Sequence, residues 1–178
     1  MWVISKLPKR LVSLRRRIAL AGQLWRAAPV AAALWLTQCA PSGRVGTDIE
    51  QLRALHEKVI LAHRKSNVEV ILEDESADYV VASRGEVTRP TLDERRERLG
   101  PYLRSATFRE YRDLIDPVIQ VSSDGTLGWV IVQVQASGVR TTQADHKEPM
   151  EFTSAWIELY EKRNGRWFRV GNVSNFKS

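Results

Sequence analysis

Apolar side chains recur three and four residues apart along residues 47–64, which is the spacing of one buried helix face. That face carries Leu52, Leu55, Val59, Ile60 and His63. Thr47 with Glu50 three positions later is a capping-box pattern, and it predicts that the helix begins at Thr47. Asn67 is placed to cap a short second helix that runs to about Glu73.

A third helix is predicted from the capping box Thr91-Leu92-Asp93-Glu94 to about Leu103. The residues expected to be buried in it are Leu92, Leu99, Tyr102 and Leu103. The run Arg95-Arg96-Glu97-Arg98 carries charges of both signs and is interpreted as the solvent-exposed face. The pattern therefore predicts a surface helix.

Between the second and third helices the pattern changes to that of a β-hairpin. Tyr79-Val80-Val81 is aromatic and β-branched, which predicts a strand over residues 77–83. Arg84-Gly85-Glu86 indicates a turn. A short return strand, Val87-Thr88-Arg89, then ends at Pro90.

Beyond residue 107 the sequence predicts only strands and turns. Asp124-Gly125 and Asn164-Gly165 are hairpin-turn signals. Asp116-Pro117 is expected to kink the strand that contains it, because proline removes a ladder donor. Residues 141–149 are polar and predict a loop. The strands expected between these signals are 108–121, 127–139, 151–162 and 166–176.

The resulting order, α-α-β-β-α-β-β-β-β, predicts an α+β domain in which helices pack on one face of a strongly bent antiparallel sheet. The length of 178 residues, with 43% hydrophobic side chains, suits one globular core.

Positive charge is concentrated in the first 39 residues. Seven of the 27 Lys and Arg residues lie there without any Asp or Glu, whereas the rest of the chain carries 20 basic and 21 acidic residues. The net charge of +6 therefore describes a leader, and the body is close to neutral. A nucleic-acid-binding fold needs positive charge in the body, so no nucleic-acid partner is expected.

The leader has the parts of an export signal. A basic segment is followed by an apolar run at residues 27–36, about half the roughly twenty residues that span a bilayer. We expect residues 1–39 to be a signal peptide or membrane-anchoring leader, 40–46 a linker, and 47–178 the mature domain. This bacterial domain is then expected outside the cytoplasm, in the periplasm or held at the membrane only by its leader or a lipid. The alternative is a mis-assigned translation start, in which part of residues 1–26 is never translated.

Cys39 is the one cysteine, which excludes an internal disulfide framework. Leu36-Thr37-Gln38-Cys39 resembles a bacterial lipobox, in which the cysteine is acylated, although Gln38 stands where a small residue is usual. Leu14-Arg15-Arg16-Arg17-Ile18 resembles a twin-arginine signal. Cys39 is therefore a lipidation candidate.

Six segments of the body carry a family resemblance. They are Ala62-His63-Arg64-Lys65-Ser66-Asn67-Val68-Glu69, Ala77-Asp78-Tyr79-Val80-Val81, Ser83-Arg84-Gly85-Glu86-Val87-Thr88-Arg89-Pro90-Thr91, Asp116-Pro117-Val118-Ile119, Ser123-Asp124-Gly125-Thr126-Leu127 and Trp156-Ile157-Glu158-Leu159-Tyr160-Glu161-Lys162. With the element order, they resemble the nuclear transport factor 2-like superfamily, also called SnoaL-like or ketosteroid isomerase-like, and most closely its uncharacterised bacterial members with export leaders. The resemblance implies a cone-shaped half-barrel of three helices and a curved sheet around a pocket, often a homodimer through the sheet. It says little about activity, because this fold hosts unrelated functions.

Ketosteroid isomerases provide one test for catalysis. They use a base aspartate late in the first strand, a tyrosine on the first helix and a protonated aspartic acid on a later strand. Alignment through Ser66-Asn67-Val68-Glu69 puts Ser83 at the base position and Val59 at the tyrosine position. Neither side chain can take that role, so we expect no ketosteroid isomerase activity.

Two-residue alternation along the strands predicts which side chains line such a pocket. The candidates form an aromatic wall with polar tips: His63, Tyr79, Ser83, Trp129, Trp156 and Glu158. A His63–Glu158 contact would make an acid–base pair. The alternative is that the aromatic rings fill the core and a backbone carbonyl satisfies His63.

No cofactor or metal is expected. His56 and His63 could share a helix face, but no spaced carboxylate completes a metal site. Neither a phosphate-binding glycine loop nor a nucleophile elbow occurs. Three functions stay open: an exported, non-catalytic protein that binds a small apolar or amphipathic molecule, a dimerisation module with an incidental pocket, and a SnoaL-like isomerase, lyase or hydrolase with unaligned catalytic residues.

Overall fold

The structure is a computed structural model in which residues 42–142 and 146–177 are described. The chain divides into two units, Met1–Gln38 and Cys39–Ser178, and every described residue belongs to the second. The predicted leader and its lipidation candidate Cys39 lie outside the described residues. In the described part, no helix is long and apolar enough to cross a membrane.

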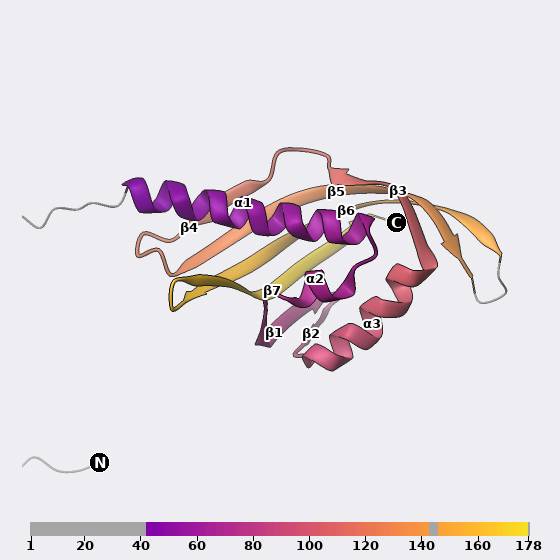
Figure 1. Ribbon diagram of the computed structural model, residues 1–178, viewed down its shortest axis with the longest axis horizontal. Coiled ribbons are helices and arrows are strands. Elements are labelled where there is room, and N and C mark those ends of the chain that lie inside the picture. The colour runs from indigo at the N-terminus through magenta and orange to yellow at the C-terminus, as the bar shows by residue number, and fades with distance from the viewer. Residues whose placement is uncertain (1–41, 143–145, 178) are drawn as a thin grey trace, which may run out of the picture. The chain divides into compact units, whose positions relative to one another are not determined.

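Three helices form where helical spacing predicts them (Figure 1). They are α1 (Ser42–Arg64), α2 (Val68–Leu72) and α3 (Leu92–Ser105). The Asn67 side chain caps α2 by accepting a hydrogen bond from the Val70 amide. At α3 the capping box is complete: Thr91 Oγ1 accepts from the Glu94 amide at 3.2 Å, and the Glu94 carboxylate accepts from the Thr91 amide at 2.7 Å.

Helix α1 begins at Ser42, so the predicted start at Thr47 is wrong, and the helix includes residues 42–46 of the segment expected to be a linker. The predicted first turn is anchored on the sheet through Asp48. Asp48 is buried, pairs with Lys162 and accepts a hydrogen bond from Trp167 Nε1 at 3.3 Å. Once a helix is nucleated, adding a turn costs little, so the helix can extend N-terminal to the cap signal.

Seven strands form one sheet in the order β2-β1-β7-β6-β5-β3, and β4 pairs with β5. They are β1 (Glu75–Ser83), β2 (Glu86–Thr88), β3 (Ala106–Asp113), β4 (Val118–Val121), β5 (Leu127–Thr141), β6 (Lys147–Arg163) and β7 (Arg166–Lys177). The α+β class and the curved sheet are confirmed. The sheet is mixed, however, because β1 runs parallel to β7. Turn signals fix only the direction of consecutive strands, and β1 and β7 lie far apart in sequence.

Two segments differ from their predicted boundaries. Segment 108–121 contains two strands, because β3 pairs with the second half of β5 and β4 with its first half. Segment 141–149, predicted as a loop, is partly strand, since β5 runs to Thr141 and β6 begins at Lys147, its pairing partner. The loop was predicted because these residues are polar. Thr141 and Lys147 lie at the end of the β5–β6 pairing, where water can solvate polar side chains while the backbone remains paired.

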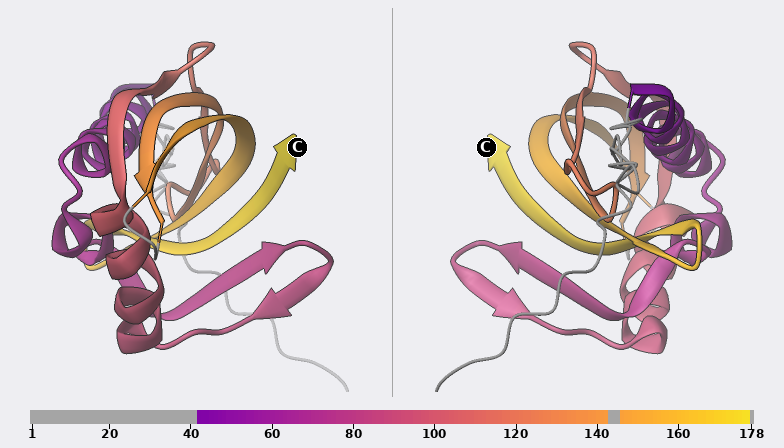
Figure 2. Two further views of the ribbon diagram at one scale, coloured as in Figure 1. Left: turned by 90° about the vertical axis from the view of Figure 1, so that its right-hand side faces the viewer. Right: turned by 90° about the vertical axis from the view of Figure 1, so that its left-hand side faces the viewer.

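The sheet buries one face and exposes the other. On β5, Val130, Val132 and Val134 point inward and form a core with Leu52 and Ile60 of α1. In Figure 2, β5 to β7 curl strongly, and α3 and the β1–β2 hairpin lie together beneath them. The inner face of the sheet, α1, α3 and this hairpin supply the walls of the site.

Candidate functional site

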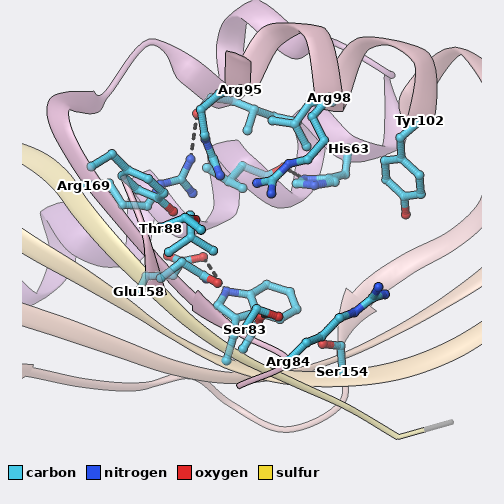
Figure 3. Close-up of a pocket in the computed structure, with 18 of the residues that line it drawn as sticks. His63, Ser83, Arg84, Thr88, Arg95, Arg98, Tyr102, Ser154, Glu158 and Arg169 are labelled. Atoms are coloured by element: carbon cyan, nitrogen blue, oxygen red, sulfur yellow. Dashed lines mark hydrogen bonds between the residues drawn. The ribbon is translucent and has the colours of Figure 1, made fainter. Parts of the chain in front are cut away.

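A cavity of about 700 Å³ lies on the inner side of the sheet (Figure 3). Its size is within the roughly 300–1,000 Å³ of small-molecule sites. The aromatic side chains in its wall are Tyr79, Tyr102, Tyr111, Phe152 and Trp156. Hydroxyl and amide groups are interspersed with them: Ser83, Thr88, Ser154, Asn172 and Ser174. The lining also includes charged side chains, so the cavity can accept an amphipathic molecule, with aromatic contacts for its apolar part and hydrogen bonds for its polar groups.

Five of the six side chains predicted to form a pocket line this cavity: His63, Tyr79, Ser83, Trp156 and Glu158. Alternation places them correctly, since Tyr79, Val81 and Ser83 lie on one face of β1, as do Trp156 and Glu158 on β6. The sixth, Trp129, does not line it.

Trp129 lies on the outer face of β5. Its neighbours Val130 and Val132 are buried on the inner face, so Trp129 points the other way, directly across from Leu159, which is 38% exposed. The sequence could not reveal this because both faces of β5 are apolar, and the pattern therefore does not mark which face is inward.

Glu158 is a buried carboxylate whose oxygens are occupied. Oε1 accepts hydrogen bonds from Trp156 Nε1 at 2.9 Å and His56 Nδ1 at 3.2 Å, and Oε2 accepts from the Tyr160 hydroxyl at 2.7 Å. Burial opposes ionisation, but the hydrogen bond and charge of His56, with the charge of Arg169, outweigh it. The pKa of Glu158 falls to about 2, and the group is therefore a permanent anion.

His56 is the partner of Glu158, and the sequence reasoning did not place it in the site. Its ring is fully buried, and Nε2 donates to Asp113 at 3.0 Å while Nδ1 donates to Glu158. Burial favours the neutral ring, but the hydrogen bonds and charges of these two carboxylates prevail and raise the pKa of His56 to about 9. His56 is thus a cation between two carboxylates. His56 lies four residues after Leu52 and therefore on the same buried face of α1, and this spacing could have predicted that His56 is buried.

His63 does not pair with Glu158. Its Nδ1 donates to the Val59 carbonyl at 2.8 Å, and its ring stacks on Tyr111 with centroids 4.6 Å apart. Burial lowers the pKa of His63 to about 4, despite the carbonyl contact, and the positive charge of Arg169 adds to this effect. The neutral ring leaves Nε2 as a hydrogen-bond acceptor. The carbonyl partner is the one that the alternative interpretation predicted.

One end of the cavity is basic, which corrects the prediction that Arg95 belongs to an exposed face of α3. Arg95 is buried and forms a bidentate pair with Glu75, whose Oε1 also accepts from Arg169 Nη2 at 2.8 Å. The Arg95 guanidinium lies 4.3 Å from the Tyr79 ring centroid. Leu92, predicted to be buried, is 40% exposed. The prediction of an exposed face is therefore wrong for Arg95, whereas Glu97 and Arg98 are exposed as predicted and the Arg96 side chain is 40% exposed.

Glu75 and Arg169 were missed for different reasons. Glu75 precedes the apolar run of β1, where a charged residue normally indicates a turn. Arg169 lies two residues after the buried Trp167 on β7, so alternation alone would have placed it inward. No local sequence pattern indicates that Glu75 and Arg169, which are far apart in sequence, form an ion pair.

The described residues contain no group of three or more His, Cys, Asp or Glu side chains that could hold a metal ion. His56, Asp113 and Glu158 lie close together, but His56 forms hydrogen bonds with both carboxylates.

Comparison with solved structures identifies the fold. An uncharacterised protein with a cystatin-like fold from Caulobacter vibrioides superposes with a TM-score of 0.59 at 15% identity, over 75% of this chain and 92% of that one. A ketosteroid isomerase-like protein from Erwinia carotovora atroseptica gives 0.54 at 16% identity, over 74% and 97%. The association domain of CaMKII from C. elegans gives 0.54 at 10% identity, over 74% and 98%.

The domain therefore has the nuclear transport factor 2-like fold. No protein-family model matches the sequence, and no curated protein matches it. The structural neighbours include an isomerase-like protein and an association domain, so the fold alone does not assign an activity.

Proposed function

We propose that this domain binds a small amphipathic molecule in its cavity and does not transform it chemically. The observation that carries the proposal is the cavity of about 700 Å³ with an aromatic wall and scattered hydroxyl groups. The basic and apolar leader at residues 1–39 is the reason for proposing that binding takes place outside the cytoplasm.

The two titratable candidates favour binding over catalysis. A general base works best when its pKa lies near the working pH. The pKa of Glu158 is about 2 and that of His63 about 4, and Glu158 already accepts hydrogen bonds on both oxygens. Ser83, at the isomerase base position, accepts a hydrogen bond from Ser174 at 2.9 Å. These groups can orient a ligand but are poor bases.

Ser83→Trp is expected to abolish binding of the neutral probe N-phenyl-1-naphthylamine, because the indole would occupy the cavity. Titration with the full-length protein, followed by probe fluorescence, measures this. Ala82→Trp is the matched control, since Ala82 pairs with Val173 on the outer face of the sheet. We expect Ser83→Trp to weaken binding at least about tenfold and Ala82→Trp to leave it unchanged. Equal effects, or a wild-type protein that binds no probe, would contradict the proposal.

A second candidate function is self-association through the outer face of the sheet. Val118, Ile131, Ile157 and Val173 lie in register across β4, β5, β6 and β7. Three of them are 39–47% exposed: Val118, Ile131 and Val173. Trp129 and Leu159 form the next row. A contiguous exposed apolar patch of this kind is typical of an interaction surface. One structural neighbour is an association domain, which adds support.

Ile131→Glu should convert a dimer to a monomer in sedimentation velocity, because two buried carboxylates would meet across a symmetric interface. Leu92→Glu is the control: Leu92 has nearly the same exposure, 40% against 39%, but lies at the start of α3. A wild-type protein that sediments as a monomer at micromolar concentration would rule out this function.

A further inference from the structure

Arg169 is a buried cation with unused donors at the cavity wall. Its side chain is 7% exposed and lines the cavity. Nη2 donates to the Ile71 carbonyl at 2.7 Å and to Glu75. Nε is buried, and the described part of the chain provides no hydrogen-bond partner for it. A buried N–H without an acceptor is costly, and native proteins rarely leave one unpaired.

Arg98 reaches the same end of the cavity from α3. It follows Arg95 by three residues, on the same side of the helix, but Arg98 is exposed whereas Arg95 is buried. Arg95 is joined to Arg169 through Glu75. Figure 3 shows the Arg98 side chain directed into the cavity. Among the residues described, no carboxylate pairs with Arg98.

The arginines at this end have few carboxylate partners. Arg95 and Arg169 share one carboxylate partner, Glu75, and no ion pair from Arg98 to a carboxylate forms among the described residues. The adjacent Glu158 already accepts hydrogen bonds on both carboxylate oxygens, from His56, Trp156 and Tyr160, and none of these donors is an arginine. An acceptor that carries negative charge would pair with Arg98 and also satisfy the buried Arg169.

We propose that this basic end of the cavity, formed by Arg95, Arg98 and Arg169, binds the anionic group of an amphipathic organic acid. Guanidinium groups match carboxylates, sulfonates and phosphate esters, which accept two parallel hydrogen bonds. The apolar part of the ligand then lies against Tyr111, Phe152 and the other aromatic side chains. The inference rests on the proposed function and specifies the class of its ligand.

Two fluorescent probes that differ in one charged group test the inference. 8-Anilinonaphthalene-1-sulfonate has the rings of N-phenyl-1-naphthylamine and adds a sulfonate. With the full-length protein, we expect the sulfonate to bind about tenfold more tightly than the neutral probe. Arg98→Gln should remove this advantage, measured as the ratio of the two probe affinities in the same variant, so that the ratio falls from about ten to about one. The control Arg104→Gln, on the same helix but outside the cavity lining, should change neither affinity.

The outcomes separate the two proposals. If neither probe binds, the proposed function fails and this inference with it. If both probes bind with equal affinity, or if Arg98→Gln and Arg104→Gln have the same effect, the anionic ligand class is wrong and the binding function stands. Displacement of the sulfonate by submillimolar inorganic phosphate would assign the site to a free ion and overturn the organic acid.

Discussion

Glu75→Gln should destabilise the domain by about 3–5 kcal/mol, the usual cost of breaking a buried ion pair by removing one partner. Glu75 is 1% exposed, and its partners Arg95 and Arg169 are 8% and 7% exposed. Glutamine has nearly the same volume but turns an N–H toward one of the guanidinium groups. Two buried cations would then face each other without a counter-charge. Since domains are stable by only about 5–15 kcal/mol, the loss is a large fraction of the total.

Urea unfolding measures this as a lower midpoint with an unchanged slope. Glu69→Gln is the matched control, because Glu69 also binds an arginine through two hydrogen bonds, from Arg96 at 2.8 and 3.1 Å, but both side chains are exposed. Exposed pairs contribute little, so the midpoint of Glu69→Gln should stay close to that of the wild type. Equal losses in the two variants would mean that the Glu75 pairs do not support the fold.

The sequence predicts the elements of this domain better than their partners. Asn164-Gly165 specifies a hairpin, and both residues adopt the positive φ values, 52° and 80°, that such a turn requires. The Thr91 capping box fixes the start of α3 in the same local way. By contrast, the parallel pairing of β1 with β7 depends on how α1 and α2 return the chain to the sheet. No short motif carries that information.

The same distinction applies to the site. Alternation placed Tyr79, Ser83 and Glu158 on the inner face because it depends only on the strand itself. The pairs that give the site its charges, however, join residues as distant as His56 and Glu158, which are 102 positions apart. Burial decides whether a charged side chain such as Arg95 faces water or a partner. A mixed-charge run on a helix looks the same in sequence in either case.

The stability of the domain should fall as the pH rises from about 6.5 to 9, and His56 is the cause. It is fully buried, and the groups that face it are Asp113 of β3 and Glu158 of β6. Their hydrogen bonds and charges outweigh burial and raise the pKa of His56 from 6.5 to about 9. A raised folded-state pKa contributes stability that is complete below the unfolded value of 6.5 and is lost as the pH rises through about 9. The loss amounts to about 3 kcal/mol.

The acidic side has the opposite sign. The pKa of His63 is lowered to about 4, so stability also declines as the pH falls from 6.5 through 4. Glu158, with its pKa lowered to about 2, contributes stability that is present above 4.5 and lost as the pH falls through 2. Stability should therefore be greatest near pH 6.5.

Urea midpoints measured from pH 4 to pH 9.5 test both limbs with two variants of α1. His56→Gln should be less stable than the wild type at pH 6.5, because it leaves Asp113 and Glu158 without their cation, and its stability should change little from pH 7 to 9. His63→Gln should keep the alkaline decline and lose most of the decline between pH 6.5 and 4. If His56→Gln declines on the alkaline side as steeply as the wild type, His56 is not the cation between these carboxylates, and Glu158 is not held as an anion by it.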